Sequence, residues 1–384
     1  MSVWLNKPPR MPLPSPTRPT RLKDHVSATL RNPGSVRHFS MADWDLLIRQ
    51  ARNAGLLARV RHVLDQHNMV KHIPNEARWH FDAAATLADK QQLAVRWEMS
   101  QISQALVKLA IPVIVLKGGA YVMAALPAAA GRLFNDIDIL VPREQLGPVE
   151  AALMLAGWNA TGLSDYDQRY YRRWMHEIPP MQHIKRATVI DVHHAILPDT
   201  ARYHPDSGKL RSRAVAVEGM PGVYVLSTED RILHSATHLF HDGELPHGLR
   251  DLTDLDLLLR EATEASDFWP RLTARADELQ LSRSLSYALR YLRYFLDTPI
   301  PDSVFAALHA AAPNRLTLIL MDAIFTRVLA PAHASCADVL TPAARLAAFV
   351  RAHWLRMPAH LLIPHLFHKA FIRSAPDNDV PKPA

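Results

Sequence analysis

Two acidic residues separated by a single residue, Asp136 and Asp138, form the pattern in this sequence with the clearest chemical meaning. They lie in Asp136-Ile-Asp-Ile-Leu-Val141, where acids alternate with aliphatic residues, which predicts a strand with both carboxylates on one face. The strand rise would hold the carboxylates roughly 6–7 Å apart, where they repel unless a cation lies between them. Mg²⁺ or Mn²⁺ prefers such oxygen ligands and leaves positions for phosphate oxygens. By itself the pattern also suits a solvated strand edge.

Cationic and flexible residues precede this pair. The β-branched run 111–116 predicts a buried strand that ends at Lys117-Gly118-Gly119. Adjacent glycines let backbone N–H groups approach a phosphate, although strand–helix turns of this kind are common. Arg132 follows in a loop, where its guanidinium could bind a phosphate oxygen, pair with one of the aspartates or be a plain surface charge.

A third carboxylate lies on a later predicted strand, Val189-Ile-Asp-Val-His193. Alternation places Asp191 and His193 on the same face of that strand. If the strand pairs beside the first, Asp191 joins the acidic pair, and His193 could bind phosphate or position a base. The alternatives are an edge-strand aspartate and a histidine satisfied within the strand.

Together these motifs resemble the DNA polymerase beta-like nucleotidyltransferase superfamily. More narrowly, L-K-G-G, R-x-x-x-D-I-D-I-L-V, the pair Gly157-Trp158 and I-D-V-H-H resemble a bacterial group of uncharacterised nucleotidyltransferases. The resemblance covers roughly residues 40–265 and includes a downstream helix pair with His234, His238, Arg250 and Asp251.

The resemblance implies a role for each motif residue. Gly118 and Gly119 match the turn that holds a triphosphate, Asp136 and Asp138 match two metal-binding carboxylates, and Asp191 matches a third that helps bind metal and can act as a base. The implied reaction is attack of a hydroxyl group on the α-phosphorus of a nucleoside triphosphate, assisted by Mg²⁺ or Mn²⁺, with release of pyrophosphate.

Two departures from the superfamily pattern leave an alternative open. Lys117 occupies a position that is usually hydrophobic, and the turn lacks the serine that often contacts phosphate, so Lys117 or Arg132 would have to compensate. A catalytically inactive nucleotidyltransferase-like module, of antitoxin or accessory type, therefore competes with the enzyme. The acceptor is undefined and includes a small molecule, a protein or peptide, or an RNA end.

The elements that must position these residues predict an α+β fold. A small mixed β-sheet carries the nucleotidyltransferase core, flanked by N-terminal helices and followed by a helical domain. The expected divisions are a disordered Pro/Arg-rich tail, the N-terminal helices, the α/β core and the C-terminal helical domain, at residues 1–40, 41–110, 111–226 and 227–384.

Two smaller patterns belong to the helical domain. His234, His238 and His241 share one side of a predicted helix and are best explained as a partly buried polar stripe. The resemblance also suggests that His238 and Asp251 line the back of a nucleotide pocket. Amphipathic residues from Leu361 on predict a packed C-terminal helix.

The composition of the chain excludes several classes of protein and of metal site. The 384 residues carry 44 Lys+Arg against 37 Asp+Glu, a formal net charge of +7, and a single cysteine. One cysteine excludes a disulfide-stapled scaffold and zinc sites built on paired cysteines. No apolar run is long enough to span a membrane, and the N-terminus is not a secretory signal, so a cytoplasmic protein is expected. Nucleic acid is a possible partner but is not favoured, because the basic residues form no continuous block.

Overall fold

Helical structure begins earlier in the chain than the sequence indicates. The computed structural model describes residues 16, 23–160, 165–241 and 245–363. The predicted disordered tail is wrong for its last part, because residues 25–38 form helix α1 (His25–Arg31) and a 3₁₀ turn (Pro33–His38). The Asp24 carboxylate accepts the backbone N–H of Ser27 and caps α1, and Pro33 is tolerated at the first position of the turn. Most of the preceding proline-rich segment lies outside the described residues.

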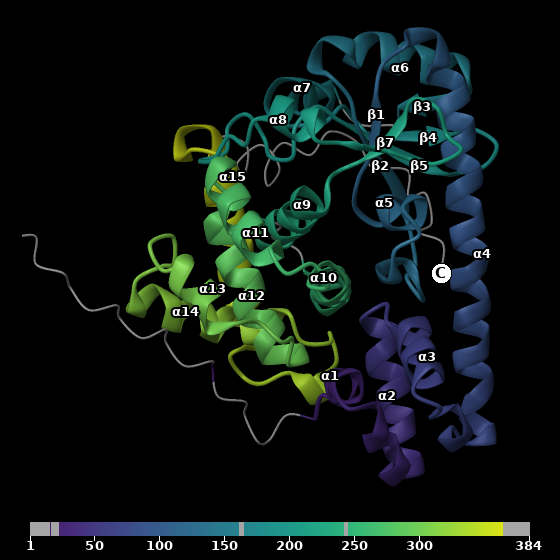
Figure 1. Ribbon diagram of the computed structural model, residues 1–384, viewed down its shortest axis with the longest axis vertical. Coiled ribbons are helices and arrows are strands. Elements are labelled where there is room, and N and C mark those ends of the chain that lie inside the picture. The colour runs from purple at the N-terminus through teal and green to yellow at the C-terminus, as the bar shows by residue number, and fades with distance from the viewer. Residues whose placement is uncertain (1–15, 17–22, 161–164, 242–244, 364–384) are drawn as a thin grey trace, which may run out of the picture.

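Three helices precede the sheet: α2 (Met41–Asn53), α3 (Leu57–Gln66) and α4 (Asn75–Leu106). Ser40 and Asp43 begin α2 with a capping box, in which each side chain accepts the backbone N–H of the other residue. The region from residue 75 to residue 106 is one long helix. Figure 1 shows α4 running along the side of the sheet, with α2 and α3 packed against its lower end.

The sheet has seven strands in the order β3-β4-β5-β2-β1-β7-β6. It is mixed, because β2 pairs parallel with β5 and β1 parallel with β7, while the other neighbours are antiparallel. The strands are β1 (Val113–Val115), β2 (Asp136–Leu140), β3 (Trp158–Ala160), β4 (Met181–His183), β5 (Val189–His193), β6 (Val215–Ala216) and β7 (Val223–Val225). Buried Ile137 and Ile139 hold the acidic strand β2 in the core, as its alternation predicts.

Four short helices connect the strands: α5 (Lys117–Met123), α6 (Leu146–Leu155), α7 (Asp165–Trp174) and α8 (Ser207–Ser212). Among these, α7 and α8 were not predicted, and neither were β3 and β6. Helix α5 begins at Lys117 itself, directly after β1, so no separate loop divides the strand from the helix.

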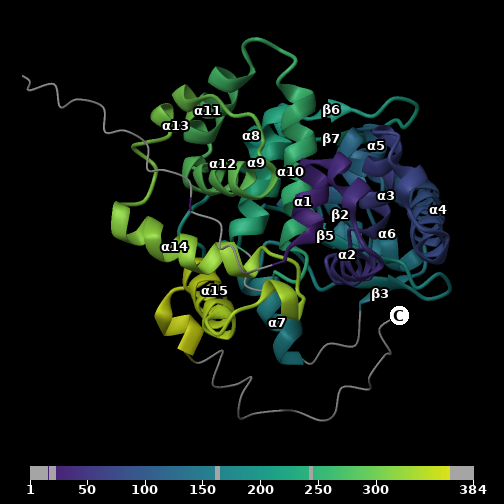
Figure 2. The same cartoon turned by 90° about the horizontal axis from the view of Figure 1, so that it is seen from below.

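The C-terminal half is helical throughout its described part. Its helices are α9 (Thr228–His241), α10 (Gly248–Ala262), α11 (Phe268–Glu278), α12 (Ser282–Leu296), α13 (Asp302–Ala307), α14 (Arg315–Val328) and α15 (Thr341–Arg356). Residues 359–363 are helical, and the rest of the predicted C-terminal helix lies outside the described residues. Figure 2 shows α9 and α10 on the side of this half that faces the sheet, and α12 packs against α1.

These layers confirm the predicted α+β class, with a mixed sheet embraced by helices from both ends of the chain. Within the described residues, no helix is both long enough and apolar enough to cross a membrane.

Candidate functional site

The parallel pairing of β2 with β5 brings two of the predicted carboxylates together. Asp138 lies directly opposite Asp191 in the register of the two strands, so Asp191 joins the acidic pair as the strand patterns suggest. Asp136 lies one pleat away on the same face of β2, opposite Val189. The sheet therefore places three carboxylates, two on one strand and one on its neighbour, at one location.

Asp138 is the most strongly paired of the three carboxylates. It is 3% exposed, and the same oxygen, Oδ1, accepts from Lys117 Nζ at 2.6 Å and lies 3.0 Å from His193 Nε2. Burial acts to raise the pKa of Asp138, but the Lys117 ammonium and the His193 hydrogen bond outweigh it and hold the pKa well below its ordinary value. Asp138 is therefore ionised at neutral pH.

Lys117 is paired with Asp138, and its predicted contact with a phosphate stays a prediction. Its ammonium lies on Asp138, and its backbone has the left-handed conformation at φ 46°, which a lysine rarely adopts. Burial acts to lower the pKa of Lys117, but Asp138 outweighs it and raises that pKa above its ordinary value. The positive φ at this turn is therefore that of Lys117, and neither Gly118 nor Gly119 has one.

Gly118 has a steric role that sequence reasoning did not identify. A Cβ atom at this position would lie 2.0 Å from Arg132 Nη1 and 2.9 Å from Phe134. Arg132 therefore packs directly against the glycine backbone, with its guanidinium also over the rings of Tyr121 and Phe134, at 5.7 and 5.2 Å from their centroids. At Gly119 a Cβ would be 3.0 Å from a Val115 methyl group, which is tight but less severe.

Arg132 pairs with a carboxylate from the helical half of the chain rather than with the strand aspartates. Its Nε donates to Asp254 Oδ2 at 2.7 Å, while Asp254 Oδ1 lies 2.9 Å from Arg59 Nη2. Arg59 is on α3 and Asp254 on α10, and both are buried. We call this the Arg59–Asp254–Arg132 bridge. It joins the N-terminal helices, the loop before β2 and the helical half.

Asp191 and Asp136 carry negative charge that no cationic side chain among the described residues balances as closely as Lys117 balances Asp138. Asp191 Oδ1 is buried and makes no hydrogen bond, and burial, followed by repulsion from Asp138 and Glu177, raises the pKa of Asp191 to about 7. Reduced solvation and the Asp138 charge also raise the pKa of Asp136, although part of that side chain reaches solvent. A surplus of negative charge therefore surrounds Asp138.

His193 lies behind Asp138, together with two residues that sequence reasoning missed. His193 is 2% exposed, with its Nδ1 3.2 Å from Glu177 Oε2. His176 lies beside it, with the two ring centroids 5.2 Å apart. His176 and Glu177 occupy a loop without periodicity, so no local pattern marks them. His193 Nε2 lies at hydrogen-bonding distance from Asp138, and its predicted phosphate contact stays a prediction.

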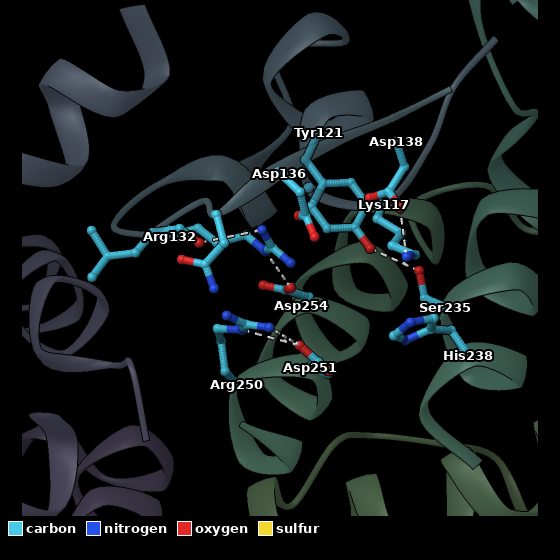
Figure 3. Close-up of a pocket in the computed structure, with 13 residues that line it drawn as sticks. Lys117, Tyr121, Arg132, Asp136, Asp138, Ser235, His238, Arg250, Asp251 and Asp254 are labelled. Carbon is cyan, nitrogen blue, oxygen red and sulfur yellow. Dashed lines mark hydrogen bonds and ion pairs between the residues drawn. The ribbon is translucent and has the colours of Figure 1, made fainter. Parts of the chain in front are cut away.

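A cavity of about 260 Å³ opens in front of the carboxylates. It lies between α5, β2 and the loop before β2 on one side and α9 and α10 on the other, and Figure 3 shows the side chains that converge on it. Its lining residues are Lys117, Gly118, Tyr121, Arg132, Leu133, Asn135, Asp136, Asp138, Ser235, His238, Arg250, Asp251 and Asp254. The suggestion that His238 and Asp251 face the pocket agrees with this lining, whereas Gly119, Asp191 and His193 are not part of it.

Two groups among the described residues have ligand atoms close enough to share a metal ion. Asp138, Asp191 and His193 form one group, and His176, Glu177 and His193 form the other, with all ligand atoms of a group within 4.8 Å of one another. Asp136 belongs to neither group as the side chains stand.

Comparison with known proteins agrees with this geometry. The family model described as uncharacterised nucleotidyltransferase matches residues 40–297, which is more than half of the chain. The chain belongs to the uncharacterised nucleotidyltransferase family. The match includes every residue of the site described above and supports a general role in nucleotidyl transfer. Neither the curated proteins nor the solved structures contain a significant match.

Proposed function

We propose that this family member transfers a nucleoside monophosphate from a nucleoside triphosphate to a hydroxyl acceptor and releases pyrophosphate. The reaction would depend on Mg²⁺ or Mn²⁺. The acceptor is a small molecule, a protein or peptide side chain, or an RNA end. The cytoplasmic location stays a prediction.

One observation carries this proposal: Asp138 and Asp191 face each other across two parallel strands, next to a cavity that Asp136 lines. Like charges so placed are unfavourable unless a cation is shared between them. The buried and unbonded Oδ1 of Asp191 fits this explanation, because a metal ion would supply the missing partner.

The residues present suit a divalent cation. Asp138 and Asp191 would hold it with His193 within reach, and Asp136 would join from the exposed end of β2. A bound divalent cation would neutralise phosphate charge and polarise the α-phosphoryl group for attack. Because carboxylate oxygens dominate the set, Mg²⁺ or Mn²⁺ fits it well.

Three cations of the cavity lie where a triphosphate would enter. Lys117, Arg132 and Arg250 line it, and each is paired with a carboxylate, namely Asp138, Asp254 and Asp251. We infer that Arg132 and Arg250 neutralise phosphate oxygens while their carboxylate partners keep them oriented. Gly118 contributes by letting Arg132 lie flat against the chain.

Asp191 is suited to accept the proton of the attacking hydroxyl group. In the absence of a bound cation, the pKa of Asp191 is about 7, so this carboxylate can accept and release a proton near neutral pH. A cation bound to Asp191 would lower that pKa. Asp138, in contrast, stays ionised and serves to hold charge.

The alternative is an inactive nucleotidyltransferase-like module, and the Lys117–Asp138 ion pair favours it. In that case the ammonium would be a permanent replacement for a metal ion. The Lys117–Asp138 ion pair would then stabilise the fold and have no catalytic role. The two functions differ in whether the metal displaces Lys117.

Nucleotidyl transfer can be tested with α-labelled nucleoside triphosphates, Mg²⁺ or Mn²⁺, and candidate acceptors, with measurement of labelled product and pyrophosphate. The native chain should give both, and the Asp136→Asn/Asp138→Asn variant neither. Asp45→Asn, at an exposed position on α2, is the matched control and should behave like the native chain. If the native chain shows no turnover and no metal-dependent nucleotide binding, the enzyme proposal is wrong.

A further inference from the structure

A second group of potential ligands lies behind the carboxylates, on the side of His193 away from Asp138. It consists of His176, Glu177 and His193, with ligand atoms all within 4.8 Å of one another. We call it the His–Glu–His group. None of its members lines the cavity, and two imidazoles with one carboxylate distinguish it chemically from the aspartates.

The backbone holds this group in place. Glu177 and His193 form an isolated antiparallel β-bridge. On either side of the bridge, the Ile178 N–H donates to Val192 at 3.0 Å and the His194 N–H donates to His176 at 2.8 Å. The segment that carries His176 and Glu177 is therefore fixed to β5, and its side chains approach His193 without any rearrangement of the chain.

Buried polar atoms without hydrogen bonds are concentrated here. His176 Nδ1 and Asp191 Oδ1 lie beneath the surface with no hydrogen-bond partner. His193 Nδ1 is also buried without a well-formed hydrogen bond, although Glu177 Oε2 lies 3.2 Å away. Buried nitrogens are usually satisfied, so an unsatisfied pair on adjacent imidazoles needs an explanation. His193 is 2% exposed, which leaves no room for bulk solvent to provide one.

We propose that the His–Glu–His group binds a divalent transition-metal ion of the imidazole-preferring class, such as Zn²⁺. Two histidine nitrogens and one carboxylate form a three-ligand set that leaves further coordination positions for water or another ligand. The ion would satisfy Nδ1 of both histidines and neutralise Glu177.

The hydrogen bond of His193 supports this assignment. A histidine that ligates a metal through one nitrogen commonly donates its other N–H to a carboxylate. His193 has this arrangement, because Nδ1 faces Glu177 and Nε2 lies 3.0 Å from Asp138 Oδ1. An ion at Nδ1 would therefore fix the tautomer in which Nε2–H donates to Asp138, and His193 would act as a positioning residue for that aspartate.

The competing explanation needs no metal. A protonated His193 between Asp138 and Glu177 would balance both charges as an imidazolium. It leaves His176 Nδ1 unsatisfied and gives His176 no function. The two explanations differ in metal uptake, which can be measured without nucleotide and independently of the proposed transfer reaction.

The test is titration of the full chain, stripped with a chelator, with Zn²⁺ by calorimetry and with Co²⁺ by absorption spectroscopy. We expect one equivalent to bind, with a Co²⁺ spectrum typical of nitrogen ligands, and excess Mg²⁺ to leave it in place. His176→Ala and the isosteric Glu177→Gln should each lose that equivalent. His67→Ala, at an exposed position on the C-terminal side of α3, should retain it. Circular dichroism confirms that each variant is folded.

Absence of stoichiometric uptake by the folded native chain would overturn the site. So would uptake that His176→Ala and Glu177→Gln leave unchanged but Asp136→Asn/Asp138→Asn removes, because the ion would then lie on the aspartates. If the His–Glu–His group takes up one metal ion but the chain transfers no nucleotide, this site is supported and the proposed function is wrong.

Discussion

At the scale of single residues, Asp138 and Asp191 face each other and yet have opposite electrostatic character. Lys117 and His193 stabilise the ionised form of Asp138, whereas Asp191 has no donor at Oδ1 and a pKa of about 7. Carboxylates whose pKa values are separated in this way commonly divide the roles of charge holder and proton acceptor. The same difference gives the two residues opposite effects on stability.

Asp191→Asn should stabilise the metal-free protein and abolish nucleotidyl transfer. The folded pKa of about 7 exceeds the ordinary value of 3.8, so between these values the folded state binds a proton that the unfolded state lacks. The free energy of unfolding of the native chain should therefore fall as the pH rises through this window. Above pH 7 the variant should be more stable by up to about 4 kcal/mol. Denaturant unfolding at several pH values measures this, and equal pH profiles for variant and native chain would contradict it.

Asp138→Asn should have the opposite effect on stability. It removes the carboxylate that pairs with Lys117 Nζ and leaves a largely buried ammonium without its partner. We expect a loss of about 3 kcal/mol in the free energy of unfolding, together with loss of activity. The double variant Lys117→Met/Asp138→Asn should recover most of that stability but no activity. Failure of the double variant to recover it would show that the ion pair is not the cause.

At the scale of elements, the junction of β1 with α5 places Gly118 directly under Arg132. Glycine at this point is needed for the approach of another side chain and not for an unusual backbone angle, since the left-handed residue is Lys117. Arg132 cannot easily move aside, because Asp254 holds its Nε and Tyr121 and Phe134 flank its guanidinium.

Gly118→Ala should therefore damage the site and also lower the melting temperature, because Arg132 belongs to the buried bridge with Asp254. The new methyl group would overlap the Arg132 guanidinium and displace it, which at a phosphate-binding position costs about 100-fold in kcat/KM. Gly147→Ala on α6 is the matched control, because a Cβ there meets no atom within 4 Å. Steady-state kinetics and thermal melting of both variants test this. Unchanged kinetics in Gly118→Ala would remove Arg132 from the phosphate site.

Asp254→Asn should disrupt the Arg59–Asp254–Arg132 bridge. The substitution keeps the shape of the side chain but leaves Arg59, which is 1% exposed, without its countercharge. Loss of one partner from a buried pair costs about 3–5 kcal/mol. Asp45→Asn removes an exposed partner of Arg49 and should cost less than about 1 kcal/mol. Chemical denaturation of the two variants measures the contrast, and similar losses would refute the role of the bridge.

Local sequence patterns anticipate the site only in part. Alternation in β2 and β5 predicts which side chains share a face, since apolar residues such as Ile137 must point into the core. The partner of Lys117 is not predictable, because an ammonium suits a phosphate and an aspartate equally well. The pairing of Arg132 with Asp254 spans 122 residues, and His176 and Glu177 lie in an aperiodic loop. Tertiary contacts alone specify these.

At the scale of the whole molecule, one continuous apolar core connects the predicted divisions of the chain. It contains Trp44 from the N-terminal helices, Trp158 from the sheet and Leu285 from the helical half. The divisions at residues 110 and 226 stay predictions, but no break in the core of the described residues corresponds to them. The cavity depends on this continuity, because its walls come from both the sheet region and the helical half.

The N-terminal helices, sheet and helical half should therefore unfold together. Fluorescence of variants that retain only Trp44 or only Trp158 should give the same denaturant midpoint as far-UV circular dichroism, which reports mainly the helices. The two tryptophans are 2% and 1% exposed, so each reports loss of its own packing. Midpoints that differ between the probes would show that these parts of the chain are separate folding units.

The Arg59–Asp254–Arg132 bridge also has a consequence for how the sequence can vary in evolution. Its three residues come from distant parts of the chain, and loss of Asp254 would leave both Arg59 and Arg132 without their shared countercharge. We therefore expect these three positions to change together among related chains. All three lie within the 40–297 match, whereas α13, α14 and α15 lie beyond it. We therefore expect the last three helices to vary more freely among related chains than the three residues of the bridge.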